Sequence, residues 1–487
     1  MRARGRTARR LVAASLLALA LLAAGVGGWG QPVAPSSAFG YFPPSGGLAP
    51  GGEVSARLPG GTAGGTAGGA AGAAAGAAAV GAIRVPIGVV GYKPAVVARL
   101  DPRTLRPLPG PRIELPFGVS GYGWSPDGSR LALGDLDDDA LHVIDPVRLR
   151  RLATIRFGIV AEAPQQLAWL GPRRVAVVAG NPGDGATLVL ADAEAGRVLS
   201  RRPLAPAGIV TAGAGDRLVL LRTPLDRIGP ARLSVVDHWG RIETVQLTGV
   251  RAGFQSPPDW DRPGAYGITR DAALAVDPTG GRAFVVAAGP TVAEVDLASL
   301  QVTYRRLRQP SSLLRRLAHW LVPPAEAKQV AGSWRSACWL GGGTLAVWGG
   351  DSSVTGDTPE TQRMDQEPSG LKLVDTRAWT VRPLDPAAPN ASWQAGRLLA
   401  YGRTWDDEAE HERGTGVTVH GPGWARHLLG TRAVDDAYLN GDLVYASVDN
   451  GGDQPGRVVV SLRSGRVVAS SAEPLPYLLL GDPGPGC

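Results

Sequence analysis

The sequence has few of the residues that build metal or redox centres. Its 487 residues include two cysteines and six histidines. No histidine stands in an HExxH spacing, and no CxxC pair, GxSxG elbow or GxxxxGK[ST] phosphate loop occurs. We therefore predict no metal ligand, no cofactor and no catalytic residue from motifs.

Lysine is also scarce, with three residues beside 47 arginines, and the formal net charge is +7. Five of the positive charges come from arginines in the first ten residues, and residues 1–30 contain no acid. Without this segment the formal charge falls to +2, and no basic stripe remains along the chain. A nucleic-acid partner is therefore not expected.

The two cysteines, Cys338 and the C-terminal Cys487, permit two interpretations. They could form a disulfide in an oxidising compartment, because the GDPGPGC tail can reach about 20 Å at ~3.3 Å per residue. Alternatively, Cys338 is a small buried apolar residue and Cys487 lies at a frayed end. We favour the second interpretation, because spacing alone says little about pairing.

The N-terminus has the composition of an export signal. A basic stretch precedes sixteen apolar or small residues, Leu11–Val26, which is short for a membrane span and suits a signal peptide. No cysteine follows that could carry a lipid. We predict a signal peptide or uncleaved anchor over 1–30, a Pro-rich and then Gly/Ala-rich linker over 31–82, and an extracytoplasmic location.

From residue 83 onward the chain repeats. Apolar runs ending in a turn residue recur at Asp101, Asp145, Asp192, Asp237, Asp296 and Asp375, with degenerate copies at His420 and Ser461. Successive offsets are 44, 47, 45, 59, 79, 45 and 41 residues. This spacing predicts an array of two-strand hairpins, with insertions in the two long copies.

A second set of hairpins alternates with the first. Its members are GWSPDGSRLALG (123–134) and the segments 168–180, 210–222, 274–288, 338–350, 392–403 and 437–448. Pro126-Asp127-Gly128 is a typical turn, so Ser129 is predicted to lie in a turn and not at a nucleophile. Tryptophans at matching places, Trp124, Trp169, Trp339 and Trp393, are predicted to pack between neighbouring sheets.

Two hairpins per repeat make a four-stranded antiparallel blade, and the predicted fold is an all-β propeller over 83–487. WSPDGSRLALG resembles the WD-like repeats of TolB-type propellers, and VDPTGGRAFVV with EVDLASLQV resembles the YVTN family of surface propellers. We count eight blades, with seven as the alternative. A C-terminal strand within 475–481 is expected to pair with the N-terminal strands and close the ring.

Long insertions are expected on one face of this ring. In an up-and-down blade the second–third loop and the crossover to the next blade share a face, and binding groups concentrate on loops held by a rigid scaffold. The insertions are 251–271, 308–333, 351–370, 404–416 and 448–457. We predict that this loop-rich face carries the function.

Acidic residues dominate the loop-rich face. The candidate binding residues are Asp259, Trp260, Asp261, Asp271, Asp406, Asp407 and His411. Calcium is the one cation considered, because it takes several oxygen ligands at one point. No loop has the alternate-residue spacing of a calcium loop, so solvated charged loops are the favoured interpretation and no metal ligand is assigned.

Residues 311–322 carry the helical pattern of the chain, with leucines and Trp320 on one side and Arg315, Arg316 and His319 on the other. A basic amphipathic helix can lie on an anionic membrane. We favour packing against the ring, because a helix of some ten residues is marginal alone. Membrane contact is otherwise expected only through the N-terminal segment.

Two functions remain open. The favoured one is a monomeric, non-catalytic binding or scaffold module that holds a protein or cell-wall ligand on the loop-rich face. The alternative is a hydrolase or lyase with an acidic site at the channel mouth on that face, using Asp259, Asp271, Asp407 or His411.

Overall fold

The computed structural model describes most of the repeat region. The described ranges are 84–91, 94–116, 118–136, 139–158, 164–180, 185–256, 267–308, 329–355, 363–406, 411–449 and 455–478. Strands are the only regular secondary structure in these ranges, which confirms the all-β prediction. No helix in this described part has the length and apolarity needed to span a membrane. The predicted signal, the linker and the helix over 311–322 lie outside it.

Six separate four-stranded antiparallel sheets make up most of the fold, and each is a blade. The first contains β1 (Ile87–Val90), β2 (Ala95–Leu100), β3 (Pro107–Leu115) and β34 (Tyr477–Leu478). The second contains β4 (Val119–Trp124), β5 (Leu131–Asp135), β6 (Ala140–Asp145) and β7 (Arg150–Arg156). The third contains β8 (Pro164–Leu170), β9 (Arg174–Ala179), β10 (Thr187–Asp192) and β11 (Arg197–Pro203).

The other three separate sheets follow the same up-and-down order. One contains β17 (Ala273–Val276), β18 (Arg282–Val286), β19 (Thr291–Asp296) and β20 (Val302–Arg306). The next contains β26 (Asn390–Gln394), β27 (Arg397–Asp406), β28 (His411–Gly421) and β29 (Trp424–Leu428). The last contains β30 (Val434–Asn440), β31 (Leu443–Val448), β32 (Gly456–Ser461) and β33 (Val467–Ser471).

The remaining ten strands join in one continuous sheet. They are β12 (Gly208–Ala214), β13 (Arg217–Thr223), β14 (Gly229–Val236), β15 (Ile242–Gln255), β16 (Ile268–Arg270), β21 (Gln329–Gly341), β22 (Thr344–Thr355), β23 (Arg363–Pro368), β24 (Leu371–Asp375) and β25 (Thr380–Asp385). The sheet holds two four-strand meanders, β12 to β15 and β21-β22-β24-β25, joined through β16.

The predicted count of eight blades, with seven as the alternative, is therefore wrong: six sheets are separate four-stranded blades, and the remaining sheet is composite. The cause is the length of β15, whose 14 residues extend past β14 and pair with β16. Strand β16 in turn pairs in parallel with the N-terminal end of β21. Sequence periodicity locates hairpins, but it does not show that two of them share hydrogen bonds through an insertion.

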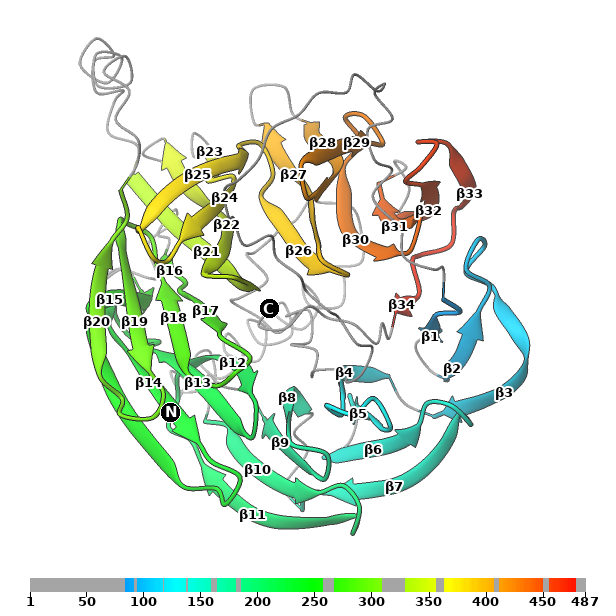
Figure 1. The fold of residues 1–487 in the computed structure, drawn as a ribbon, viewed down its shortest axis with the longest axis horizontal. Helices are drawn as coiled ribbons and strands as arrows, with labels where there is room; N and C mark the ends of the chain where they lie inside the picture. Colours follow the sequence, from blue (N-terminus) through cyan, green and yellow to red (C-terminus); the bar gives the residue numbers. More distant parts are fainter. Residues whose placement is uncertain are drawn as a thin grey trace, which may run out of the picture.

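The sheets are arranged around a common axis as a β-propeller (Figure 1). Their first strands face the axis and touch in succession: β4 contacts β8, β8 contacts β12, β12 contacts β17, and β17 contacts β21. The core is divided into apolar layers between successive sheets. Leu167, Trp169 and Val177 belong to one such layer, and Phe284, Trp339 and Val374 to another.

The predicted packing of the first-strand tryptophans between sheets is confirmed for the buried members. Trp124 packs against Val97 and Leu131, which lie in the first and second blades. The indole of Trp169 donates a hydrogen bond of 2.9 Å to the carbonyl of Gly123 in the neighbouring blade. Trp339 stacks on Phe284 with ring centroids 5.2 Å apart. These rings join separate sheets, so their burial stabilises the ring and not one blade alone.

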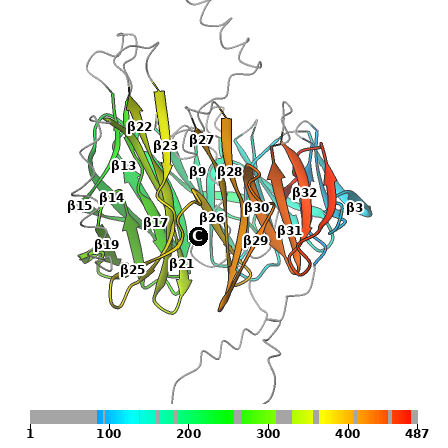
Figure 2. The same ribbon diagram turned by 90° about the horizontal axis from the view of Figure 1, so that it is seen from above.

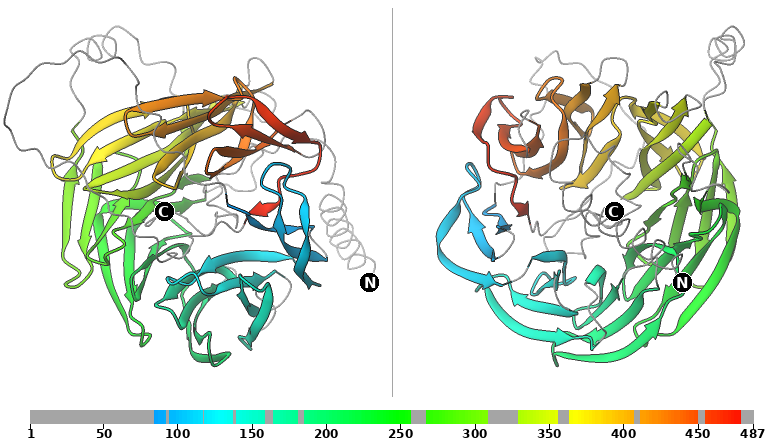
Figure 3. Two further views of the ribbon diagram at one scale, coloured as in Figure 1. Left: turned by 45° about the vertical axis from the view of Figure 1, so that its right-hand side comes forward. Right: turned by 180° about the vertical axis from the view of Figure 1, so that it is seen from behind.

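The two ends of the repeat region meet in one sheet. Gly88 pairs with Leu478 and Val89 with Tyr477 in the antiparallel pairing of β1 with β34, which lie side by side in Figures 1 and 3. The Leu478 side chain is fully buried with Leu100 and Tyr445. This pairing covers the edge of β1 that would otherwise be exposed.

Five of the Asp-led turns between third and fourth strands share one geometry. In each, a carboxylate oxygen accepts backbone N–H bonds from the residues two and three positions later, as at Asp101, Asp145, Asp192, Asp296 and Asp375. Four residues after the Asp, the chain takes a left-handed conformation, at Leu105, Leu149, Gly196, Leu300 and Trp379. The N–H bonds stabilise the carboxylate, which lowers the pKa of each Asp.

Ser129 lies in a turn, as predicted. Its hydroxyl donates to Asp127 Oδ2 at 2.8 Å, and Ser125, buried below, donates to Asp127 Oδ1 at 2.6 Å. The N–H of Gly128 donates to the carbonyl of Ser125. Asp127 thus holds the turn together.

Cys338 is disulfide-bonded, so the favoured interpretation, in which Cys338 and Cys487 are not paired, is wrong. The residue is fully buried on β21 among Ala346, Trp348 and Ala391, which is the burial expected of a small apolar residue. Cys487 is the other cysteine of the chain. We therefore expect the bond to join Cys338 to Cys487, which lies outside the described residues.

Candidate functional site

The loops between second and third strands and the crossovers between blades lie at one face, since strand direction alternates within a blade. The Asp-led turns lie at the opposite face. At the loop-rich face several strands are longer than their blade requires. These are β15, β21, β22, β27 and β28, of 14, 13, 12, 10 and 11 residues.

The extensions form a continuous rim. Beyond Gly349, β22 pairs with β21 on one side and β23 on the other. Strand β23 contacts β27, whose outer part pairs with β28 up to Asp406 and His411. In Figure 2 the outer ends of β22, β23, β27 and β28 point to the same side of the ring. We call β15–β16, the outer halves of β21 and β22, β23, and the outer part of β27–β28 the extended rim.

The extended rim contains some of the residues singled out from the sequence. Asp271 follows β16, and its N–H donates to the carbonyl of Ser333 on β21 at 2.8 Å. Asp406 and His411 are backbone partners at the end of β27–β28. Asp259, Trp260, Asp261 and Asp407 lie outside the described residues. The structure therefore places three candidates on the rim and brings only Asp406 and His411 together.

Arginine fixes the base of the rim. Arg335 on β21 donates to both carboxylate oxygens of Asp351 on β22, at 2.9 and 3.2 Å, and to the carbonyls of Trp334 and Gly350. The Arg335 side chain is mostly buried, so these charge-assisted bonds are partly shielded from water. Asp351, one of the acids of the loop-rich face, thus has a structural partner.

A carboxyl–tyrosine cluster lies farther round the same face, where β27 approaches β30. Tyr438 donates to Asp436 Oδ2 at 2.7 Å, and Tyr401 donates to Asp436 Oδ1 at 3.3 Å. Next to them, Arg403 and Asp435 form an ion pair with 3.0 Å between Nε and Oδ1. These contacts join two neighbouring blades at the loop-rich face.

The cluster has shifted pKa values with a common cause. Burial raises the pKa of Asp436 to about 6, although the bonds from Tyr438 and Tyr401 lower it in part. Burial, and next the charge of Asp436, raise the pKa of both tyrosines well above their ordinary value. Strongly shifted carboxyls are common at functional sites, and they also occur in buried structural networks. Both carboxyl oxygens of Asp436 are occupied by tyrosines, which favours a structural role.

The raised pKa of Asp436 predicts a pH-dependent stability. Because the folded state holds this proton more tightly than the unfolded state, the contribution of Asp436 to the free energy of unfolding is greatest below the unfolded pKa of about 4. It falls as the pH rises to about 6 and is constant above that, for a total loss of about 2–3 kcal/mol. Denaturant unfolding between pH 4 and 8 measures this. The difference between wild type and Asp436→Asn should vary with pH between 4 and 6, and a constant difference would contradict the assignment.

No group of three or more His, Cys, Asp or Glu residues in the described ranges is arranged to hold a metal ion. The acidic loop residues considered for calcium lie mostly outside those ranges. The prediction of no cofactor and no metal ligand, with calcium as the alternative, therefore stays a prediction from the sequence.

Comparison with known proteins gives a distant similarity of fold. No protein-family model matches the chain, and no curated protein matches it. Among solved structures, the chain is similar to dihydro-heme d1 dehydrogenase NirN in complex with DHE, at 14% identity and a TM-score of 0.48, over 81% of this chain and 73% of that one. It is also similar to Kuenenia stuttgartiensis hydrazine synthase, at 13% identity and a TM-score of 0.32, over 61% and 78% of the two chains.

Sequence reasoning missed the carboxyl–tyrosine cluster. Asp436 stands in VDDAYLN, which looks like any first strand of the repeat, and Tyr401 comes from the preceding repeat. Only the contact between β27 and β30 brings them together. The alternation in this strand could have shown that Asp436 and Tyr438 share a side, but not that Tyr401 meets them.

Proposed function

We propose that this chain is an exported β-propeller, related to the WD-like and YVTN-type repeat propellers, that binds a protein or cell-envelope ligand through its loop-rich face. The observation that carries the proposal is the extended rim. Strands lengthened at one face, in the ten-stranded sheet and in the β26–β29 blade next to it, build a raised edge. Ring stability does not require this edge, because the other blades close with short strands.

The same face offers groups suited to recognition. Rigid strands carry the connections that include the predicted binding residues, with Asp271 at one end of the rim and Asp406 and His411 at the other. Binding groups concentrate on loops that a rigid scaffold holds, and these connections are of that kind. The ligand is proposed to contact these residues together with the loop residues Asp259, Trp260, Asp261 and Asp407.

Export is proposed from the N-terminal segment and is supported by the disulfide at Cys338, since such bonds persist in oxidising compartments. The linker over 31–82 would then hold the ring away from a membrane or wall. We expect the protein to be recovered outside the cytoplasm. Intact mass shows whether the mature chain starts near residue 31 or keeps residues 1–30. Accumulation in the cytoplasm with a free Cys338 thiol would contradict export.

A rim variant tests the binding face. Replacing 404–413 with a two-residue Asn-Gly turn joins β27 to β28 directly and removes the part of the extended rim that these two strands build. The control variant leaves the loop-rich face unchanged and replaces Trp239, an exposed residue of the opposite face, with Ser. Both variants are compared for binding to purified cell-wall and membrane fractions. We expect at least a tenfold loss for the rim variant and no change for Trp239→Ser. Equal binding by both folded proteins would overturn the proposed face.

A further inference from the structure

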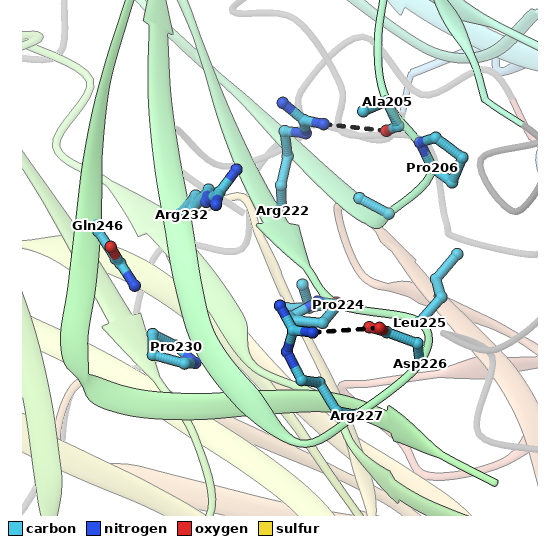
Figure 4. Close-up of a pocket in the computed structure, with 12 residues that line it drawn as sticks. Ala205, Pro206, Arg222, Pro224, Leu225, Asp226, Arg227, Pro230, Arg232 and Gln246 are labelled. Carbon is cyan, nitrogen blue, oxygen red and sulfur yellow. Dashed lines mark hydrogen bonds and ion pairs between the residues drawn. The ribbon is translucent and has the colours of Figure 1, made fainter.

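A pocket of about 190 Å³ opens between the 205–207 crossover and the β12–β15 meander (Figure 4). Its walls are the 205–207 crossover, the β13–β14 loop with Asp226 and Arg227, and side chains of β13, β14 and β15. The crossover and the second–third loop both lie at the loop-rich face. The pocket is therefore part of that face, and β15, through Gln246, is the one strand that it shares with the extended rim.

Arginine dominates the pocket because of strand register. Arg222 pairs directly with Arg232 across β13 and β14, and Arg232 pairs with Gln246 across β14 and β15. Leu220 and Leu218, two and four positions before Arg222 on β13, pack against the third blade. Side chains two positions apart in a strand share a side, so Arg222 points to that side as well. In Figure 4 the Arg222 and Arg232 side chains lie next to each other on adjacent strands.

Like charges directly opposite each other destabilise a sheet, so the direct pairing of Arg222 with Arg232 calls for an explanation. Arg222 is partly buried and donates from Nη2 to the carbonyl of Ala205 at 2.9 Å. Its Nε is buried and has no hydrogen-bond partner among the described residues. Burial, followed by the charge of Arg232, lowers the pKa of Arg222 from its ordinary value. An anion between the two guanidinium groups would offset both the cost of burying the Arg222 charge and its repulsion by Arg232.

Charge and size narrow the choice of anion. Asp226 forms an exposed ion pair with Arg227 at 3.2 Å, and the three arginines and Asp226 together leave a net charge of +2 in the lining. A phosphate monoester carries about −1.5 to −2 at neutral pH, whereas a simple carboxylate carries −1. The volume is below the roughly 300–1,000 Å³ of pockets for drug-sized ligands, so it suits a small head group.

We propose that the pocket formed by Arg222, Arg232 and Arg227 binds a phosphate monoester group. The guanidinium groups of Arg222 and Arg232, which line the pocket, donate hydrogen bonds to the phosphate oxygens. Arg227 closes the site from the loop. The inference does not depend on export or on the rim, and its failure would leave the proposed function standing.

Isothermal titration of the full chain with methyl phosphate tests the site, at constant ionic strength and with acetate as the competing anion. Arg232 is exposed, so Arg232→Gln is expected to fold normally. We expect it to weaken methyl phosphate binding about tenfold or more, because a hydrogen bond to a charged group is lost. Arg241→Gln removes an exposed arginine from the opposite end of the same meander and should leave the affinity unchanged.

Two results would overturn the proposal: acetate binding as tightly as methyl phosphate, or equal affinities for Arg232→Gln and wild type. Once binding is established, cell-wall fragments identify the source of the group. If the fragments compete with methyl phosphate, and phosphatase treatment of the fragments abolishes the competition, the phosphate group belongs to an envelope polymer. Fragments that do not compete assign it to a soluble phosphate ester.

Discussion

Reduction of the disulfide at Cys338 lowers the melting temperature by about 3–6 °C, and Cys487→Ser does the same. The bond is expected to close a loop from residue 338 to residue 487. In the chain-entropy account, closing a loop of this length restricts the unfolded chain by roughly 5 kcal/mol, and measured effects are typically about 2–4 kcal/mol. In a chain of this size, each kcal/mol shifts the midpoint by only about 1–2 °C.

The measurement compares oxidised and reduced wild type with Cys487→Ser by calorimetry, after intact mass has shown a gain of two hydrogens on reduction. The Ser variant is preferable to a change at Cys338, because Cys338 is fully buried and a new hydroxyl there would lack a partner. Equal midpoints for the oxidised and reduced protein would show that the bond does not restrict the unfolded chain.

The repeat pattern predicted the main architecture because each blade is built from local hairpins. The alternation of apolar residues and the Asp-led turns are properties of short segments, so they survive as sequence signals. Asp145 and Asp296, for example, both accept N–H bonds from the residues two and three positions later, and each turn forms without help from another blade. The fold class therefore follows from the sequence.

The composite sheet and the disulfide could not be predicted in the same way. Strand β16 is three residues long and pairs in parallel with β21, a partner about 60 positions away in sequence. A stretch so short has no periodicity to detect. Cys338 has the burial of a small apolar residue, and that burial is equally compatible with a disulfide.

The arginine pocket shows a similar limit. Arg222 and Arg232 are ordinary members of a chain rich in arginine, and each stands in a strand that alternates as expected. Their significance comes from direct pairing across β13 and β14, which needs the register, and from the 205–207 crossover that covers them. Register is set by turn length and packing and cannot be read from one strand.

The strongest loss of stability is expected at the closure of the ring. Leu478→Ala should lower the free energy of unfolding by about 3–5 kcal/mol, because Leu478 is fully buried between the first and last blades with Leu100, Leu443 and Tyr445. Val468→Ala, on the outer strand β33, changes an exposed valine and should stay within about 0.5 kcal/mol. Urea unfolding of both variants and wild type measures the difference.

Two truncations separate closure from the disulfide. A chain ending at Leu478 keeps β34 and loses Cys487, so it should lose only the contribution of the disulfide. A chain ending at Pro476 also loses β34, which uncovers the edge of β1 and exposes Leu100 beside it. An uncovered strand edge can pair with another chain, so this second truncation should lose more stability and self-associate in light scattering. If both truncations unfold at the same urea concentration and remain monomeric, the pairing of β34 with β1 does not hold the ring closed.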